Sequence, residues 1–199
     1  MDGGLSPDGV AELLIGRRDQ LREQLDADAR RLRSVEARLR TIEKENPVNT
    51  FTETPLPQLR LVQLSARIEE MSEIEEEIGG MFGRVNALID AAGVDRVGPG
   101  IATYTTDGDG MVAAAAEQIG AAPVPAGLDA AVVPPQQRAL TTRYVGDDLS
   151  GIQQAWQALV AEVEARGLVP QGTCREVYER TPFDGPAGGW VVDLQQPVA

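Results

Sequence analysis

The feature that most constrains the fold is an internal repeat in the C-terminal part of the chain. Residues 81–104 align without gaps on residues 155–178, at an offset of 74 positions. The identical positions include two glycines and one tyrosine in the same register, which is typical of a duplicated structural unit. They are Ala87/Ala161, Ala91/Ala165, Gly93/Gly167, Gly98/Gly172 and Tyr104/Tyr178. The repeat predicts a domain built from two similar halves.

Each copy of the repeat has the pattern of a helix, a glycine stop and a strand. In the second copy, apolar residues recur at helical spacing from Trp156 to Val163, and Gly167 follows as a C-cap. Further extended stretches are expected at residues 58–68, 111–117, 136–144, 173–179 and 190–195. The fold class is therefore α+β, with two pseudo-symmetric strand–helix–strand–strand repeats. Helices should cover one face of a sheet, with a cleft where the halves meet.

The N-terminal region has a different character. All eight aromatic residues lie at or after Phe51, and the proline-containing segment 47–57 is expected to be a linker. Upstream, apolar residues from Leu21 to Ile42 follow a heptad spacing, with Asp28 in one core position. We expect residues 16–46 to form a dimerisation coiled-coil helix, and residues 58–199 to form the domain. The alternative is a helix that packs on its own domain.

Composition excludes several kinds of chemistry. The chain contains no histidine, so a Ser–His or Cys–His nucleophile is impossible. A single cysteine, Cys174, argues against a zinc site and an internal disulfide. No metal and no cofactor are expected. The N-terminus lacks the basic start and apolar core of an export signal, and no apolar run is long enough to span a bilayer. These features predict a cytoplasmic protein without membrane contact.

Charge is unevenly distributed along the chain. Residues 1–46 contain 10 acidic and 9 basic residues, whereas residues 47–199 contain 21 acidic and 9 basic residues. An acidic domain repels phosphates, so direct nucleic-acid binding by the C-terminal part is disfavoured. Cationic or neutral partners suit it better. The alternative explanation is that the acidity serves solubility alone.

The C-terminal part resembles a known family of ligand-binding domains. The matching features in residues 143–198 are Gly146, Trp156, the GLVPQG turn at 167–172 and the closing strand WVVDLQQPV. With PLPQLRLVQLSARI and GPGIATY in the first copy, they resemble the GyrI-like domain. This domain is the effector-binding module of many MerR-type and AraC-type regulators. The resemblance implies a small organic ligand that is drug-like and either cationic or aromatic.

The N-terminal part resembles a segment of MerR-type regulators. GLSPDGVAELL, followed by a long Arg/Glu/Leu helix, is similar to the end of the DNA-binding module and the dimerisation helix of that family. Residues 1–15 are thus expected to be a remnant helix. The resemblance implies a homodimer through residues 16–46. The winged helix-turn-helix is absent from this chain, so DNA contact is expected only through such a module.

Glu176 is the first candidate for ligand binding. The repeat places Ala102 at the corresponding position, so only the second half carries a carboxylate there. The resemblance implies that this glutamate lies at the base of the ligand pocket. A carboxylate among aromatic rings can hold a lipophilic cation through charge and through the ring faces. The alternative is a solvent-facing glutamate paired with Arg175 or Arg180.

Aromatic residues complete the candidate set. Tyr178 shares a strand face with Glu176, and Tyr104 is its partner in the repeat. For both tyrosines the alternative is a core position. Trp156 lies on the apolar stripe of its helix, which favours a core role over ligand contact. The remaining candidates are Tyr144, Trp190 and Asp193.

A hydrolase is the main alternative function. Some stand-alone GyrI-like proteins are hydrolases that rely on paired acids and tyrosines, and Glu176 would then be a general base. Asp193 stands where relatives often carry glutamate, which weakens the case for a second acid. Cys174 is interpreted as a small core residue rather than a nucleophile. A third possibility is a protein that sequesters its ligand. The favoured interpretation is a non-enzymatic sensor.

Overall fold

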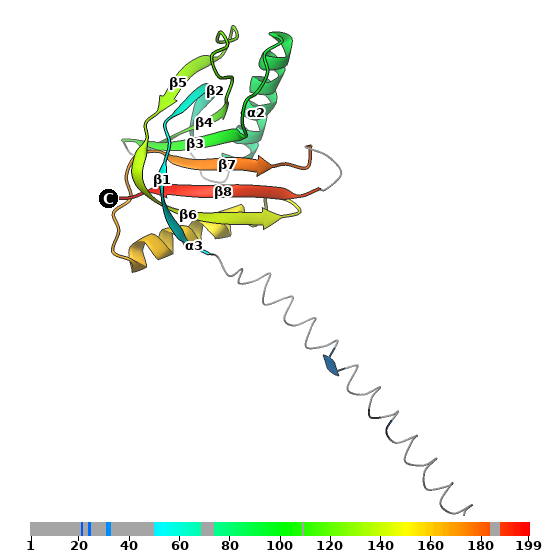
Figure 1. The fold of residues 1–199 in the computed structure, drawn as a ribbon, viewed down its shortest axis with the longest axis vertical. Helices are drawn as coiled ribbons and strands as arrows, with labels where there is room; N and C mark the ends of the chain where they lie inside the picture. Colours follow the sequence, from blue (N-terminus) through cyan, green and yellow to red (C-terminus); the bar gives the residue numbers. More distant parts are fainter. Residues whose placement is uncertain are drawn as a thin grey trace, which may run out of the picture. The chain divides into compact units, whose positions relative to one another are not determined.

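A single antiparallel sheet with two helices forms the domain in the computed structural model (Figure 1). The structure describes residues 50–68, 74–108, 110–183 and 188–199, and four isolated helical positions: Leu21, Gln24, Arg31 and Leu32. The chain divides into two units, Met1–Val48 and Asn49–Ala199. The predicted remnant helix lies outside the described residues. The predicted coiled coil does too, apart from those four positions.

The two halves of the domain have the same order of elements. The first half consists of β1 (Thr52–Leu56), β2 (Leu59–Ile68), α2 (Ile74–Ala91), β3 (Gly100–Asp107) and β4 (Gly110–Glu117). The second consists of β5 (Asp129–Val133), β6 (Gln136–Gly146), α3 (Ile152–Ala165), β7 (Cys174–Arg180) and β8 (Trp190–Pro197). The predicted α+β class is confirmed, and both copies of the repeat fold alike.

The strands are ordered β1-β6-β8-β7-β3-β4-β2-β5. The two halves meet at the centre, where β3 pairs with β7. Their register sets Ala102 opposite Glu176, Gly100 opposite Tyr178, and Tyr104 opposite Cys174. The repeat offset of 74 relates Gly100 to Cys174 and Tyr104 to Tyr178, so it converts the Gly100–Tyr178 pair into the Tyr104–Cys174 pair. The pseudo-two-fold axis of the domain therefore passes beside the Ala102–Glu176 pair.

Strands β1 and β5 lie in segments that the sequence predicts to be irregular. β1 falls within the expected linker 47–57, and β5 within the proline-rich segment between the two halves. β1 is an edge strand paired only with β6, and its register shifts at Pro55. An edge strand tolerates a proline because one side of its backbone needs no ladder hydrogen bonds. The prolines in and around these two short strands are the reason that the sequence predicts loops there.

The helices cover opposite ends of one sheet face. α2 contacts β2 and β4, and α3 contacts β6 and β8. Each buries one stripe, which comprises Ile78, Met81, Val85 and Ile89 in α2 and Ala155, Leu159 and Val163 in α3. Removing each large aliphatic side chain from water contributes about 1.5–3 kcal/mol. Gly93 and Gly167 end the two helices with φ near +65°, a conformation that residues with a Cβ rarely adopt.

The opposite face of the sheet holds a second, smaller core. Its buried residues are Leu61, Ile101, Ala116, Val133 and Val177. Two short connections cross this face, one from β1 to β2 and one from β5 to β6. The Arg175 guanidinium donates to the carbonyl oxygens of Pro57 (2.9 Å) and Pro134 (2.8 Å), one in each connection. The two crossings thus meet at one buried arginine.

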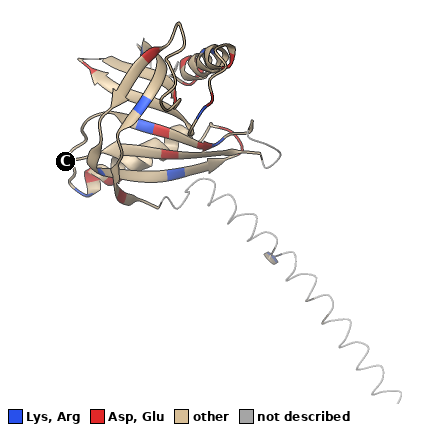
Figure 2. Cartoon of the chain, turned by 45° about the horizontal axis from the view of Figure 1, so that its top comes forward, with Lys and Arg blue, Asp and Glu red and all other residues tan. Residues whose placement is uncertain are grey.

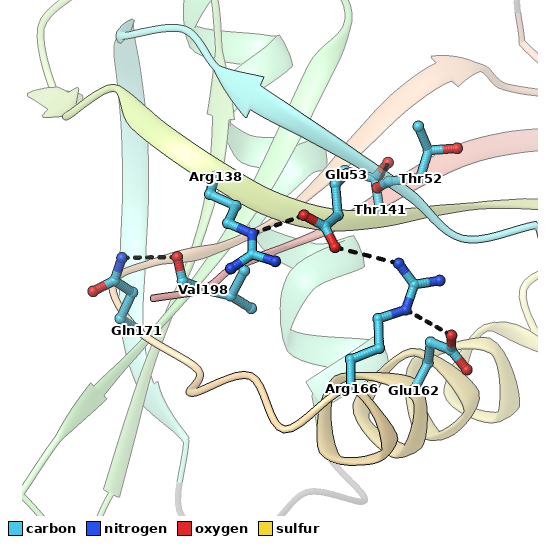
Figure 3. Close-up of polar contacts among 8 residues, drawn as sticks. All are labelled: Thr52, Glu53, Arg138, Thr141, Glu162, Arg166, Gln171 and Val198. Carbon is cyan, nitrogen blue, oxygen red and sulfur yellow. Dashed lines mark hydrogen bonds and ion pairs between the residues drawn. The ribbon is translucent and has the colours of Figure 1, made fainter.

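Strand β1 is also held by a surface ion-pair network (Figure 3). The Glu53 carboxylate accepts from Arg138 of β6 at 2.7 Å and from Arg166 at the end of α3 at 3.4 Å. Arg166 in turn donates to Glu162 one helical turn earlier. These side chains are partly exposed, so the network adds little stability. It does connect the first strand to both the sheet and α3.

Acidic residues are spread over helices, strands and loops of the described domain (Figure 2). This agrees with the acidic excess of residues 47–199. Neither described helix combines the length and apolarity that a membrane crossing needs.

Candidate functional site

Glu176 is a buried carboxylate in the central strand pair. Its side chain points to the helix-covered face and is only 4% exposed. Three side chains donate hydrogen bonds to it. The Trp156 Nε1 donates to Oε1 at 2.6 Å, while the hydroxyls of Tyr104 (2.9 Å) and Tyr178 (2.7 Å) both donate to Oε2. Four residues singled out from the sequence therefore form one cluster.

The two halves of the domain contribute jointly to this cluster. Tyr104 comes from β3, Tyr178 from β7 and Trp156 from α3. Because Glu176 lies beside the pseudo-two-fold axis, two tyrosines related by the repeat reach the same carboxylate oxygen. Ala102, at the matching position of the first half, leaves the space in front of β3 to these rings. The duplication thus explains how one acid receives matched donors from both sides.

The aromatic rings also pack as pairs related by the repeat. Trp156 lies edge-on to Tyr104, with ring centroids 6.4 Å apart, and Phe82 lies edge-on to Tyr178 at 5.3 Å. Phe82 is the repeat counterpart of Trp156. Each helix therefore places an aromatic residue against the tyrosine of the other half. Only the tryptophan has an N–H, so only α3 donates to the carboxylate.

A line of rings continues from Tyr178 toward the surface. Trp190 at the start of β8 lies edge-on to Tyr178 at 5.9 Å, and Phe183 lies edge-on to Trp190 at 6.4 Å. Phe183 is 87% exposed, whereas Tyr178 is 8% exposed. The predicted residue Trp190 thus connects the buried acid to a surface aromatic ring.

Burial dominates the electrostatics of the site. Removal from water raises the pKa of Glu176 above its ordinary value, and the three hydrogen bonds oppose that rise by favouring the charged form. Burial and the nearby Glu176 charge raise the pKa of both Tyr104 and Tyr178, so both hydroxyls remain protonated donors. The site therefore offers one titratable carboxylate in a setting of fixed donors.

Among the residues that the structure describes, no arginine pairs with Glu176 on its own face of the sheet. Arg175 is adjacent in sequence, but its side chain lies on the opposite face and contacts the two proline carbonyls. The alternative interpretation, a solvent-facing glutamate paired with Arg175 or Arg180, does not hold, because Glu176 is buried and accepts from Tyr104, Trp156 and Tyr178. Within the described residues, the compensation that Glu176 receives comes from neutral donors, which leaves its negative charge available to a cation.

Two predicted residues do not join the cluster. The Tyr144 hydroxyl donates to the backbone oxygen of Asp148 at 2.6 Å, although its ring packs against the main core. Asp193 lies on the opposite face, where both of its oxygens accept from Arg143 at 2.6 and 2.8 Å. A separate hollow of about 250 Å³ includes this pair, and its lining residues are Thr50, Thr52, Thr141, Thr142, Arg143 and Asp193.

Cys174 lies on the same face as Glu176 and behaves as a core residue. Its thiol donates to the Gln196 Oε1 at 3.0 Å. Burial raises the pKa of Cys174 to about 11, so its thiolate is scarce near neutral pH. The interpretation of Cys174 as a packing residue rather than a nucleophile is supported.

Two residues near the site did not enter the set chosen from the sequence. Phe82 packs on Tyr178, and its pairing with Trp156 in the repeat was the available signal. Glu117 is a second carboxylate on the helix-covered face and is 5% exposed. The only sequence signal for it is that it ends the alanine-rich strand β4.

The chemistry open to the Glu176 cluster is that of one acid surrounded by neutral donors. Among the described residues, no group of three His, Cys, Asp or Glu side chains is arranged to hold a metal ion. A buried carboxylate with fixed donors can hold a cationic ligand, or it can accept a proton. The three donors stabilise the charged form that holds a cation, whereas the raised pKa of Glu176 suits proton transfer, so the cluster is chemically capable of both roles.

Searches against protein-family models and curated proteins found no match. Several solved structures share the fold. The C-terminal domain of EcmrR is 17% identical with a TM-score of 0.60, covering 76% of this chain and 98% of that domain. EcmrR in a DNA complex is 17% identical with a TM-score of 0.61, and the match covers 94% of this chain and 71% of EcmrR. SAV2435 bound to tetraphenylphosphonium is 15% identical with a TM-score of 0.59, covering 75% and 94%.

These similarities establish the architecture of residues 49–199. The domain has the fold of the EcmrR C-terminal domain and of SAV2435, which is consistent with the GyrI-like domain that the sequence resembles. At 15–17% identity the likeness concerns the fold alone.

Proposed function

We propose that this domain is the effector-binding part of a MerR-type transcription regulator and binds lipophilic organic cations through Glu176. The observation that carries the proposal is the buried Glu176 carboxylate, which three neutral donors hold at the junction of the two halves. SAV2435, which has the same fold, binds tetraphenylphosphonium, a cation of this class. The negative charge selects for cations, and the rings select for apolar, aromatic ligands.

The rings supply the second part of the recognition. Partly exposed Tyr104 and Trp156 contact the carboxylate, and partly exposed Trp190 packs against Tyr178. The faces of these rings attract positive charge. A lipophilic cation has little water to lose, so it exchanges weak hydration for contact with a carboxylate in a low-dielectric setting. A strongly hydrated ion such as ammonium lacks this advantage.

The regulator role extends the proposal to the N-terminal unit. Residues 16–46 would pair two chains, and DNA would be contacted only through a helix-turn-helix module. EcmrR in its DNA complex matches 94% of this chain, more than the domain alone. Ligand binding would then bias the arrangement of the paired chains. Sedimentation with and without residues 1–46 tests the pairing, and a monomer in both cases would contradict it.

The decisive test of ligand binding is Glu176→Gln with tetraphenylphosphonium as the probe. We expect the variant to bind about tenfold to a hundredfold more weakly, because a charged contact of about 1–3 kcal/mol is lost. Isothermal titration calorimetry measures both dissociation constants directly.

Asp193→Asn provides the matched control. It removes the same charge from the same domain, but from the opposite face, where Asp193 pairs with Arg143. Its affinity should stay within about twofold of the wild type, since screened long-range charge contributes little. Equal affinity in wild type and Glu176→Gln would overturn the proposal, as would turnover of the bound compound that depends on Glu176.

A further inference from the structure

The pseudo-symmetry of the sheet identifies a second pair of related polar residues. Gly100 and Cys174 occupy equivalent places, two residues before the central pair on β3 and β7. The register of β3 with β4 continues to Glu117 opposite Gly100, and that of β7 with β8 continues to Gln196 opposite Cys174. Glu117 and Gln196 are therefore counterparts. The first half carries a carboxylate where the second carries an amide.

The side chains of Glu117 and Gln196 are both buried on the helix-covered face, but their surroundings differ. Gln196 is 7% exposed, accepts from the Cys174 thiol and donates to the Pro197 oxygen. Glu117 is 5% exposed and lies over Gly100, which has no side chain to meet it. A Cβ placed on Gly100 would be 3.0 Å from the Glu117 Oε1. The glycine thus makes room for the carboxylate.

The aromatic cluster links Glu117 to Glu176. The same Cβ position on Gly100 would be 3.1 Å from the Phe82 Cε1, so the Phe82 ring edge and the Glu117 carboxylate flank one spot. Phe82 is edge-on to Tyr178, whose hydroxyl donates to Glu176. Phe82 and Tyr178 therefore lie in the region between the two buried carboxylates. By strand spacing and rise, the two Cα atoms are about 12 Å apart.

We propose that Glu117 is a second anionic contact in the ligand site, which makes the site selective for organic cations with two positive centres. This inference rests on the proposed function, because Glu176 would hold the first centre. Phe82 and Tyr178 would line the apolar segment between the two centres. Gln196, the counterpart of Glu117 in the second half, is neutral. The second positive centre of the ligand would therefore bind only on the side of the first half of the domain.

The test compares decamethonium with decyltrimethylammonium, which have the same alkyl chain but two charges and one charge respectively. For the wild type we expect decamethonium to bind about tenfold more tightly, the effect of one additional charged contact. Glu117→Gln should bring the two dissociation constants within about twofold of each other while decyltrimethylammonium affinity is retained. Glu117→Asp keeps the charge and should keep a preference. Glu164→Gln, on the exposed side of α3, is the matched control and should behave as wild type.

The outcomes separate this inference from the proposed function. If Glu176→Gln weakens both compounds but Glu117→Gln leaves their ratio unchanged, the second contact is wrong and the first stands. If the wild type binds neither compound nor tetraphenylphosphonium, both proposals fail. If Glu117→Gln loses both compounds, Glu117→Asp decides: a retained preference for decamethonium supports the inference, and no preference overturns it.

Discussion

Replacing Arg175 by methionine should lower the free energy of unfolding by about 3 kcal/mol. The guanidinium donates to Pro57 and Pro134, and a hydrogen bond from a charged donor contributes about 1.5–3 kcal/mol. Part of this loss is offset, because burial also lowers the pKa of Arg175 and thereby shows that its charge is poorly solvated. The stabilisation from the two hydrogen bonds is larger than the free energy regained by no longer burying the charge, since the bonds join both crossing connections at one point.

Urea unfolding followed by far-UV circular dichroism measures this effect, and the melting temperature should fall by about 10 °C. Arg138→Met is the matched control, because it removes an arginine whose ion pair with Glu53 is partly exposed. That variant should lose less than about 1 kcal/mol. Equal stability of the two variants would show that Arg175 does not hold the crossings together.

The repeat explains why the central part of the fold was predictable. A helix, a glycine stop and a strand recur at a fixed offset, and the same glycines end both helices in the structure with φ near +65°. The alternation in β7 placed Glu176 and Tyr178 on one face. The pairing of Tyr104 with Tyr178 in the repeat suggested that both line one site, and in the structure both hydroxyls donate to the Glu176 carboxylate.

The parts that sequence reasoning missed depend on contacts between distant segments. Nothing local indicates that β1 and β5 pair across the halves, because β1 contains Pro55 and β5 is flanked by prolines, and prolines are typical of loops. An edge position makes the proline of β1 tolerable. The same limit applies to Asp193. The strand that contains Asp193 was predicted, but the face to which the Asp193 side chain points depends on the register of β8. That register places Asp193 beside Arg143 instead of Glu176. The role of Trp156 as a donor also depended on the separation of α3 from β7.

The affinity for tetraphenylphosphonium should depend on pH through Glu176. Burial raises the pKa of this carboxyl above 4.5, and only its charged form attracts the cation. Below that pKa, affinity should fall by about tenfold for each unit of pH, and above it the affinity should be constant. The ligand itself carries a permanent charge, so the dependence reports on the protein. Binding below the pKa should release a proton, which calorimetry in buffers of different ionisation enthalpy detects.

The composition of the chain makes this measurement unusually clear. There is no histidine, and the pKa of Cys174 is raised to about 11, so these common sources of titration near neutrality are absent. Glu176→Gln should give a flat profile, and the difference between the two profiles isolates one group.

The stability of the ligand-free protein provides an independent check with a defined sign. Because the folded pKa of Glu176 is raised, the folded state holds the proton more tightly than the unfolded state. The resulting stabilisation is complete below about pH 4.5 and is lost as the pH rises through the folded pKa. Wild type should therefore lose stability relative to Glu176→Gln across that window, while its affinity for the cation increases. Opposite trends in stability and affinity follow from one buried acid, and parallel trends would show that another group controls the binding.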